Sequence, residues 1–158
     1  MTQPYGDSRP KVFTRPFATQ DVAACAQIFA AAWARAFPAH PRVIDEGVFL
    51  RETEGEIIVV AEWNGAIAGF AALWPPEAFV HHLYVAPALH NRGIGRALIA
   101  ALDARAALTA YGARLSLKCQ LSNLNARAFY ARLGFVEGEA EGDRGMDEIG
   151  AWVRLWAD

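Results

Sequence analysis

The sequence predicts an α/β fold, in which strand patterns and helix patterns alternate along a chain of 158 residues. Residues 55–74 read as two strands joined at Asn64 and Gly65, which form the strongest hairpin turn signal in the chain. Residues 79–85 are rich in β-branched and aromatic side chains and therefore predict another strand. A glycine-containing turn then leads into a run of helix formers, which predicts a helix over residues 94–108.

The remaining segments continue this alternation of strands and helices. Helices are expected where apolar residues recur at helical spacing, and strands where apolar residues alternate with polar ones. The expected helices cover 19–36, with Thr19 as the N-cap, 43–50 and 123–133; the expected strands cover 11–17, 113–121, 135–140 and 149–156, the last two pairing antiparallel across a polar loop at 141–145. Residues 1–10 are expected to be a flexible tail, and residues 11–158 a single domain without repeats or linkers.

Composition limits the classes of protein to which the chain can belong. A hydrophobic fraction of 54% excludes disorder for the bulk of the chain, and a net charge of −2 gives no reason to expect nucleic acid or a membrane as partner. No stretch approaches the ~18 apolar residues of a membrane span, and the first ten residues lack a signal-peptide core. A cytoplasmic location is therefore expected. Cys25 and Cys119 form no disulfide framework or zinc site and are expected to be reduced core residues.

The stretch from 79 to 98 joins a strand, a glycine-containing turn and a helix start, which is a common way to bind phosphate. The first N–H groups of a helix have no partner within the helix, and the helix dipole adds partial positive charge there. Gly93 and Gly95 let a phosphate approach the backbone closely. The dinucleotide fingerprint would need a third glycine where Leu98 stands, and the P-loop pattern is absent, so a nucleotide-binding domain is disfavoured.

Two motifs carry a family resemblance. Residues 90–95, His-Asn-Arg-Gly-Ile-Gly, resemble the acetyl-CoA signature Q/R-x-x-G-x-G/A of the GNAT superfamily, with His90 standing where the family usually has Gln or Arg. Residues 123–135 resemble the second family signature, N-x-x-A-x-x-F-Y-x-x-x-G-F, and fill every fixed position. Because both motifs occur in the family's order, the chain is identified as a member of the GNAT superfamily of acyl-CoA-dependent N-acyltransferases.

The resemblance implies both a topology and an activity. The implied topology is a mixed, mostly antiparallel sheet of six to seven strands, with strands four and five splayed apart and about four flanking helices. The implied activity is transfer of an acetyl group from acetyl-CoA to a primary amine of a small molecule or protein, by direct attack in a ternary complex. The alternative is a non-catalytic acyl-CoA-binding sensor of the same fold, against which the intact Asn123 and Tyr130 argue. A homodimer is also consistent with the family.

The resemblance assigns the co-substrate, acetyl-CoA, to the fourth strand, the turn after it and the start of the last helix. Backbone N–H groups of the turn would hold the pyrophosphate, and the strand backbone would pair with the pantetheine arm and supply the oxyanion donor near Leu83. The expected cofactor-binding residues are Leu83, Tyr84, Val85, His90, Asn91, Arg92, Gly93, Ile94, Gly95, Arg96 and Asn123. The alternative for Arg92 and Arg96 is that they are solvated side chains at the start of the helix. The alternative for Asn123 is that it caps a helix.

Candidates for the proton transfers follow from the same motifs. The resemblance points to Tyr130 as the donor that stabilises the leaving CoA thiolate, the alternative being a packed helix aromatic. The base is expected on the fourth strand, with His81 as first choice, His82 and Glu77 as alternatives, and an unaided water chain as the last possibility. Strand alternation is expected to turn His81 and His82 to opposite faces, with no third ligand near, so no metal ion is expected.

The amine acceptor is expected to lie beside the first two helices and the loop at 74–78. Candidates for its wall are Trp33, Phe37, Trp74 and Glu77, an aromatic set with one carboxylate. Such a wall would suit a cationic or aromatic amine. Trp33 also lies on an apolar helix face, where core packing is the alternative role.

Overall fold

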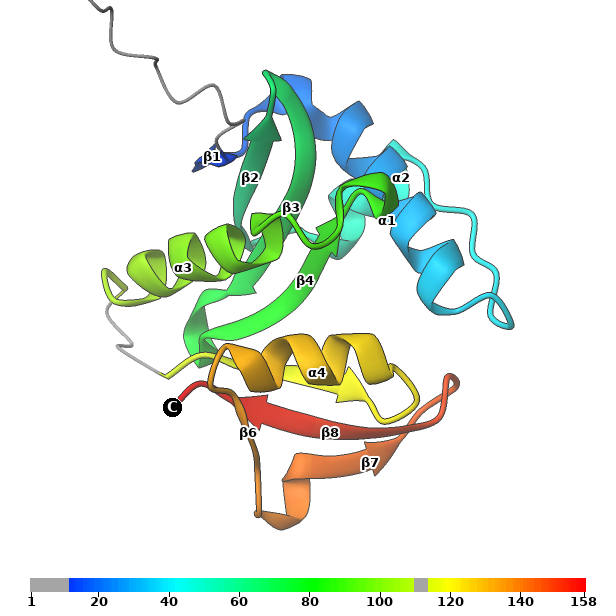
Figure 1. Ribbon diagram of the computed structural model, residues 1–158, viewed down its shortest axis with the longest axis vertical. Coiled ribbons are helices and arrows are strands. Elements are labelled where there is room, and N and C mark those ends of the chain that lie inside the picture. Colours follow the sequence, from blue (N-terminus) through cyan, green and yellow to red (C-terminus); the bar gives the residue numbers. More distant parts are fainter. Residues whose placement is uncertain (1–11, 110–113) are drawn as a thin grey trace, which may run out of the picture.

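The computed structural model describes residues 12–109 and 114–158, in which strands and helices follow the expected order (Figure 1). The strands are β1 (Val12–Pro16), β2 (Ile57–Trp63), β3 (Ala66–Trp74), β4 (Phe79–Val85), β5 (Ser116–Gln120), β6 (Val136–Glu137), β7 (Arg144–Met146) and β8 (Ala151–Trp156). The α-helices are α1 (Val22–Ala36), α2 (Glu46–Glu52), α3 (Ile94–Ala106) and α4 (Leu124–Arg132). The expected tail at 1–10 lies outside the described residues, and the single-domain organisation stays a prediction.

All the described strands belong to one sheet, in the order β1-β2-β3-β4-β5-β8-β6, with β7 also paired to β8. Neighbours are antiparallel except β4 and β5, which are parallel. The sheet has eight strands instead of six to seven, because the expected loop at 141–145 contains the start of β7. The backbone of Gly145 lies so close to the Trp152 side chain that a Cβ would overlap the ring, which lets this polar segment pair with β8.

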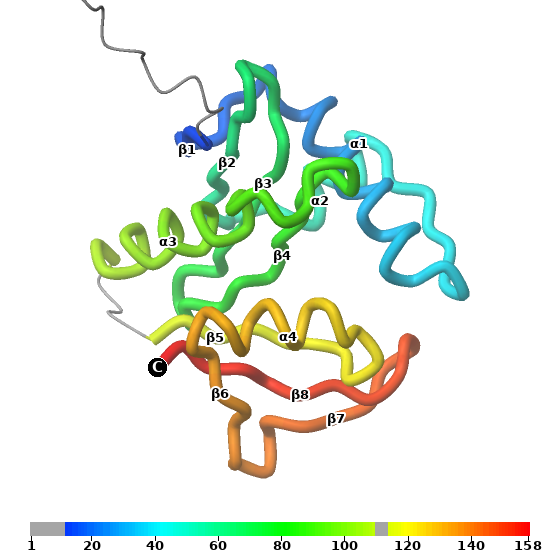
Figure 2. The backbone as a smooth tube through the Cα atoms, viewed as in Figure 1, coloured from blue at the N-terminus to red at the C-terminus, as the bar shows by residue number. Residues whose placement is uncertain are grey.

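Two apolar layers cover the sheet, one on each face. The layer under α1 and α2 is centred on the fully buried rings of Phe29, Phe49 and Phe70. The layer on the other face joins α3 and α4 through Leu98 and Tyr130, and Figure 2 shows these two helices on the same side of the strands. Cys25 and Cys119 are both buried in these layers, which confirms that they are core residues.

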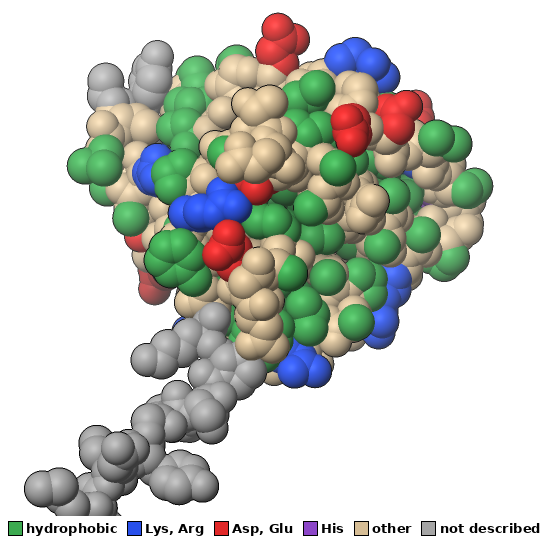
Figure 3. Space-filling model, turned by 90° about the horizontal axis from the view of Figure 1, so that it is seen from above, with side chains coloured by type: hydrophobic (Ala, Val, Ile, Leu, Met, Phe, Trp, Pro, Cys, Tyr) green, Lys and Arg blue, Asp and Glu red, His purple; other side chains and the backbone are tan. Residues whose placement is uncertain are grey.

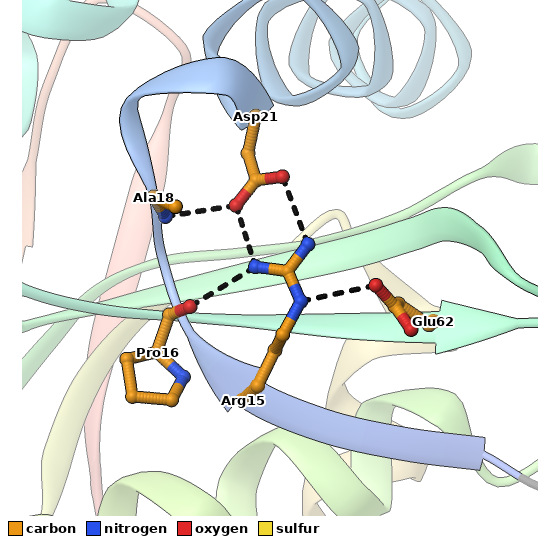
Figure 4. A network of polar contacts seen from close by, with 5 residues as sticks. All are labelled: Arg15, Pro16, Ala18, Asp21 and Glu62. Atoms are coloured by element: carbon orange, nitrogen blue, oxygen red, sulfur yellow. Dashed lines mark hydrogen bonds and ion pairs between the residues drawn. The ribbon is translucent and has the colours of Figure 1, made fainter.

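An ion-pair network at the start of the chain joins β1 to the beginning of α1 (Figure 4). Arg15 donates to both carboxylate oxygens of Asp21, at 2.7 and 2.9 Å, and to Glu62 of β2 at 3.0 Å. Asp21 also accepts from the Ala18 N–H at 2.8 Å, and the Arg15 hydrogen bonds lower the pKa of its carboxyl. The expected Thr19 N-cap is wrong, because Thr19–Asp21 form a 3₁₀ turn and α1 begins only at Val22.

Strands β4 and β5 part soon after they meet. Their register contains two pairs, Phe79 with Ser116 and Val80 with Leu117, after which β4 continues to Val85 without β5 beside it. Figure 1 shows the two strands diverging, with α3 and α4 on either side of the opening. The expected splay of strands four and five is therefore confirmed. Main-chain groups along this edge of β4 are left for another partner.

A β-bulge interrupts β4 at its histidines. Opposite β3, Val80 pairs with Leu73 and His82 pairs with Ala72, so that His81 is the extra residue. A bulge breaks the strict alternation of side chains. The centroids of the His81 and His82 rings consequently lie 4.1 Å apart. The expectation that these two side chains face opposite ways is therefore wrong.

The described surface carries mixed charges. On the face seen from above in Figure 3, acidic and basic side chains are scattered among apolar ones. None of the helices in the described part of the chain has the length and apolar character needed to cross a membrane.

Candidate functional site

A cleft of about 920 Å³ opens where β4 and β5 part. Its walls come from both strands, from the turn before α3, from the inner face of α4 and from the C-terminal end of α1. Among the expected site residues, those that line it are Phe37, His81, Leu83, Tyr84, Val85, His90, Asn91, Gly93, Ile94, Gly95, Arg96, Asn123 and Tyr130. The separation of two strands thus brings both sequence motifs to one cavity.

The turn before α3 is shaped to receive an anion. Asn91 and Gly93 both adopt positive φ, 62° and 79°, which turns the chain sharply into the helix. The first backbone hydrogen bond of the helix runs from the Ala97 N–H to the Gly93 carbonyl, at 3.0 Å. The three N–H groups of 94–96 therefore have no partner within the helix. They lie at the cleft, where the helix dipole favours negative charge.

The two motifs pack directly against each other. A Cβ on Gly95 would lie 2.9 Å from the ring of Phe129 on α4, which is closer than real contacts allow. Glycine at this position lets α4 approach the N-terminus of α3. The second motif therefore supports the geometry of the first.

Tyr130 lines the cleft from the inner face of α4. Its ring is 8% exposed and lies between Phe129 and Phe135, with centroid distances of 5.1 and 5.5 Å. Burial raises the pKa of its phenol well above the usual value. The hydroxyl therefore keeps its proton at neutral pH and can act as a hydrogen-bond donor to a group in the cleft.

Asn123 caps α4, and its position leaves the expected contact with the coenzyme open as a prediction. Its Oδ1 accepts from the Ala126 N–H at 3.2 Å, which caps α4, and the residue also lines the cleft. Arg96 lines the cleft as well. Arg92 does not: its guanidinium lies over the Trp63 ring, 5.5 Å from the centroid.

His81 faces the cleft with a buried carboxylate behind it. Its Nδ1 lies 2.6 Å from Oε1 of Glu56, and because a carboxylate can only accept, Nδ1 carries the hydrogen. The His81 side chain is 48% exposed, whereas that of Glu56 is 4% exposed. The hydrogen bond to Glu56 raises the pKa of His81. The ring thus has a fixed tautomer, with Nε2 as its free acceptor nitrogen.

Glu56, which contacts a residue of the cleft, is among the residues that sequence reasoning missed. It precedes β2, where a lone carboxylate is typical of a solvated loop. The pairing of β2, β3 and β4 explains its position. Ile57, the residue after Glu56, pairs with Leu73 of β3. Leu73 in turn pairs with Val80 of β4, which is next to His81. Only the three-strand register could have revealed this contact.

His82 lies in a different environment from His81. It is 5% exposed, and its ring contacts Phe29 of α1 with a centroid distance of 5.2 Å. Burial lowers the pKa of His82 to about 4, so the imidazole is neutral at pH 7. It is not among the residues that line the cleft.

The expected acceptor wall is only partly assembled. Phe37 lines the cleft, and Trp33 packs against it at a centroid distance of 4.7 Å but lines a neighbouring hollow that also contains Arg42. Trp74 and Glu77 line neither space. Polar residues of the cleft that the sequence did not single out are Arg35, Lys118, Gln120, Asn125 and Arg132.

The cleft also contains a thiol, Cys119, that is unsuited to nucleophilic catalysis. Cys119 is 4% exposed, and burial raises the pKa of its thiol to about 11. Since the thiolate is the nucleophile, this residue is inert at neutral pH.

A model of the acetyltransferase (GNAT) family matches residues 22–135, and the chain belongs to this family. Its activity is therefore that of an N-acetyltransferase, with acetyl-CoA as the co-substrate.

Individual proteins agree with this assignment. The chain is 37% identical, over 100 residues, to the 5-NmdU N-acetyltransferase of Pseudomonas phage PaMx11, a match that covers 60% of this chain and 69% of that protein. A GCN5-related N-acetyltransferase structure from Rhodopseudomonas palustris, described as "Aminotransferase, Class-II", is 27% identical over 96% of both chains, with a TM-score of 0.74. The acetyl-CoA-bound yncA structure from Salmonella typhimurium, 22% identical over 93% of this chain and 94% of its own, shares the fold with a TM-score of 0.70.

Proposed function

We propose that the chain acetylates a primary amine by direct attack on acetyl-CoA in a ternary complex, with His81 as the base. The observation that carries the proposal is the single cleft, which joins the anion-accepting turn, the unpaired edge of β4, the Tyr130 phenol and the His81 imidazole. Bound acetyl-CoA supplies the activated acetyl carbonyl. The residues around it must hold it, take a proton from the amine and stabilise the sulfur that leaves.

Binding would rely on backbone groups more than on charged side chains. The N–H groups of 94–96 would donate to the diphosphate, with Arg96 adding positive charge. The free edge of β4 at Leu83–Val85 would hydrogen-bond to the pantetheine amides as an added strand would. An N–H near Leu83 would donate to the developing oxyanion, where one such donor is typically worth about 2.7–4 kcal/mol. Asn123 would contact the same arm from α4.

Two side chains would handle the protons. The amine nitrogen gives its proton to Nε2 of His81 as the C–N bond forms, while Glu56 holds Nδ1–H and stabilises the imidazolium. The C–S bond then breaks, and the sulfur leaves as a thiolate that accepts a hydrogen bond from the Tyr130 hydroxyl, while the proton taken from the amine stays on His81. Glu56 is a positioning residue in this scheme, since it contacts His81 and not the reacting atoms.

The acceptor class is proposed as a small-molecule or protein amine. The phage relative is named a 5-NmdU N-acetyltransferase, so 5-NmdU is the first acceptor to test. Small diamines, aromatic amines and a peptide amino terminus complete a panel that covers the cationic and aromatic amines suggested by Phe37 and its neighbours.

The rival function is an acyl-CoA sensor without turnover, and one assay separates the two. The protein is incubated with acetyl-CoA and each amine, and free thiol is followed over time. The proposal expects thiol release that depends on a particular amine and persists in Val43→Ala, a change at a side chain that is 88% exposed and outside the cleft. Acetyl-CoA binding without amine-dependent release across the whole panel would favour the sensor.

A further inference from the structure

The β4 bulge creates a second chemical feature beside the cleft. Because His81 is the extra residue, its ring and that of His82 lie together, and both lie near Glu56. One donor atom from each of these three residues lies within 4.8 Å of the others. We propose that Glu56, His81 and His82 bind one divalent transition-metal ion of the Zn²⁺ type, and that this ion blocks the acetyl-transfer site.

Two atoms of this cluster have no hydrogen-bond partner although they are buried. They are Oε2 of Glu56, on a side chain 4% exposed, and Nδ1 of His82, on a residue 5% exposed. Buried polar atoms are normally hydrogen-bonded, and an orphaned pair needs an explanation such as an ion or a bridging water. Both atoms are lone-pair donors in the states that bind metal, so one cation would satisfy them together.

The ring of His82 is already oriented as a metal-binding histidine would be. Its Nε2 lies 3.4 Å from the Glu52 carbonyl oxygen, the side to which a ring N–H would point. Histidines that bind a metal through one nitrogen commonly donate the other N–H to a carbonyl, which fixes the tautomer. With Nε2 protonated, Nδ1 presents its lone pair to the cluster.

The ligand set and its access route favour zinc. Two imidazoles and a carboxylate are a ligand combination of zinc sites that keep one position for water. Zinc bonds of about 2.0–2.2 Å place neighbouring ligand atoms roughly 3.4 Å apart. Because the three donor atoms now lie within 4.8 Å of one another, their distances must shorten by at most about 1.4 Å when the ion binds. The half-exposed His81 gives the ion a path from the cleft, while the carboxylate and His82 hold it from inside.

Metal binding would use the groups that the reaction needs. Coordination through Nδ1 of His81 replaces its hydrogen bond to Glu56, and the hydrogen of the neutral ring moves from Nδ1 to Nε2. Nε2 can then no longer accept a proton from the amine. This consequence rests on the proposed role of His81 as the base, whereas metal binding itself does not.

The test is a binding measurement on the full chain, without acetyl-CoA. Chelator-treated protein is titrated with Zn²⁺ against a chromophoric competitor, and separately with Co²⁺, whose visible bands report coordination by nitrogen and oxygen. We expect one ion per chain for the wild type. Glu56→Gln and His81→Ala should each weaken binding by about 100-fold or more and abolish the cobalt bands, since even outer groups of a metal site cost about 10–100-fold.

Controls keep the test independent of folding and of catalysis. His40→Ala removes a histidine elsewhere and should bind Zn²⁺ as the wild type does. Far-UV circular dichroism and acetyl-CoA binding show that Glu56→Gln and His81→Ala are folded. The absence of stoichiometric binding, or equal binding by these two variants and the wild type, would overturn the metal site and leave a bridging water as the cluster's occupant. If Zn²⁺ binds as expected but does not inhibit thiol release, the metal site stands and the proposed base is wrong.

Discussion

The two ends of the cleft are built in different ways. At the end proposed to bind the coenzyme, the turn before α3 and the inner face of α4 offer backbone N–H groups and a packed phenol, and the residues come from two short sequence motifs. At the end proposed to bind the acceptor, the half-exposed imidazole of His81 is held by the buried carboxylate of Glu56, which precedes β2. The coenzyme end is therefore encoded locally, whereas the acceptor end depends on strand register and on one bulge. Substitutions should distinguish the two ends. Changes at the acceptor end should alter turnover, whereas changes in the turn before α3 should alter coenzyme binding.

The largest effect on turnover is expected from His81→Ala. Removing a general base typically lowers turnover by about 10²–10⁴-fold. The acetyl-CoA affinity should change little, because the coenzyme end is untouched. Steady-state kinetics with the responsive amine, together with calorimetric acetyl-CoA binding, measure both quantities. Turnover within about twofold of the wild type would remove His81 from the proton path and leave the water chain as the base.

Glu56→Gln should have the next largest effect. Gln keeps the size of the side chain but no longer stabilises an imidazolium, and we expect kcat to fall about tenfold or more. Glu54→Gln is the matched control, since it removes an exposed carboxylate two residues away. A purely structural role for Glu56 would instead lower the thermal midpoint while leaving kcat of the folded fraction intact.

Tyr130→Phe tests the coenzyme end by its chemistry. Loss of the phenol should lower turnover about tenfold or more, because the thiolate then leaves without its donor. The ring and its contacts with Phe129 and Phe135 are preserved, so acetyl-CoA affinity should remain. Equal turnover in the variant and the wild type would leave Tyr130 as a packed aromatic.

Gly95→Ala tests the same end by its geometry. The added Cβ would press on the Phe129 ring at 2.9 Å, and such overpacking typically costs about 1–3 kcal/mol. We expect the KM for acetyl-CoA to rise roughly five- to tenfold, with a smaller change in kcat. Gly142→Ala is the control, because a Cβ there meets nothing within 4 Å. An unchanged KM for Gly95→Ala would mean that the spacing of α3 and α4 does not govern coenzyme binding.

Asp21→Asn should lower the stability of the fold, and of all these substitutions it should have the smallest effect on turnover. Breaking the hydrogen bonds from Arg15 to a buried carboxylate should lower the free energy of unfolding by about 1–3 kcal/mol. The pKa of Asp21 is lowered in the folded state, so its contribution is full above about pH 4, the unfolded value, and is lost as pH falls through the folded value. Urea unfolding at pH 7 and pH 3 checks this: a variant as stable as the wild type at pH 7 would contradict it.

The same contrast explains how much of the molecule the sequence could predict. The main helices, the strands β1 to β5 and the splay of β4 from β5 agree with expectation, because periodicity and the family resemblance both specify them. The coenzyme turn is a local motif, and its residues meet at one cleft as expected, although Arg92 instead lies over Trp63.

What the sequence could not provide are the contacts that depend on register. The bulge at His81 leaves no residue signature, and it reverses the expected separation of the two histidines. From the sequence, Glu56 is typical of a solvated carboxylate. It lies beside β4 because the pairing of β2 with β3 at Leu73, and of Leu73 with Val80, brings it there. The polar composition of β7 predicts a loop. Its pairing with β8 depends on the close approach of Gly145 to Trp152, which the composition does not reveal.

The most direct measurement of the central idea is a crystal structure with acetyl-CoA bound. We expect diphosphate oxygens within about 3 Å of the N–H groups of 94–96, the pantetheine amides along the free edge of β4, and the sulfur within hydrogen-bonding reach of the Tyr130 hydroxyl. A coenzyme bound outside the opening between β4 and β5, or a sulfur remote from Tyr130, would contradict the account.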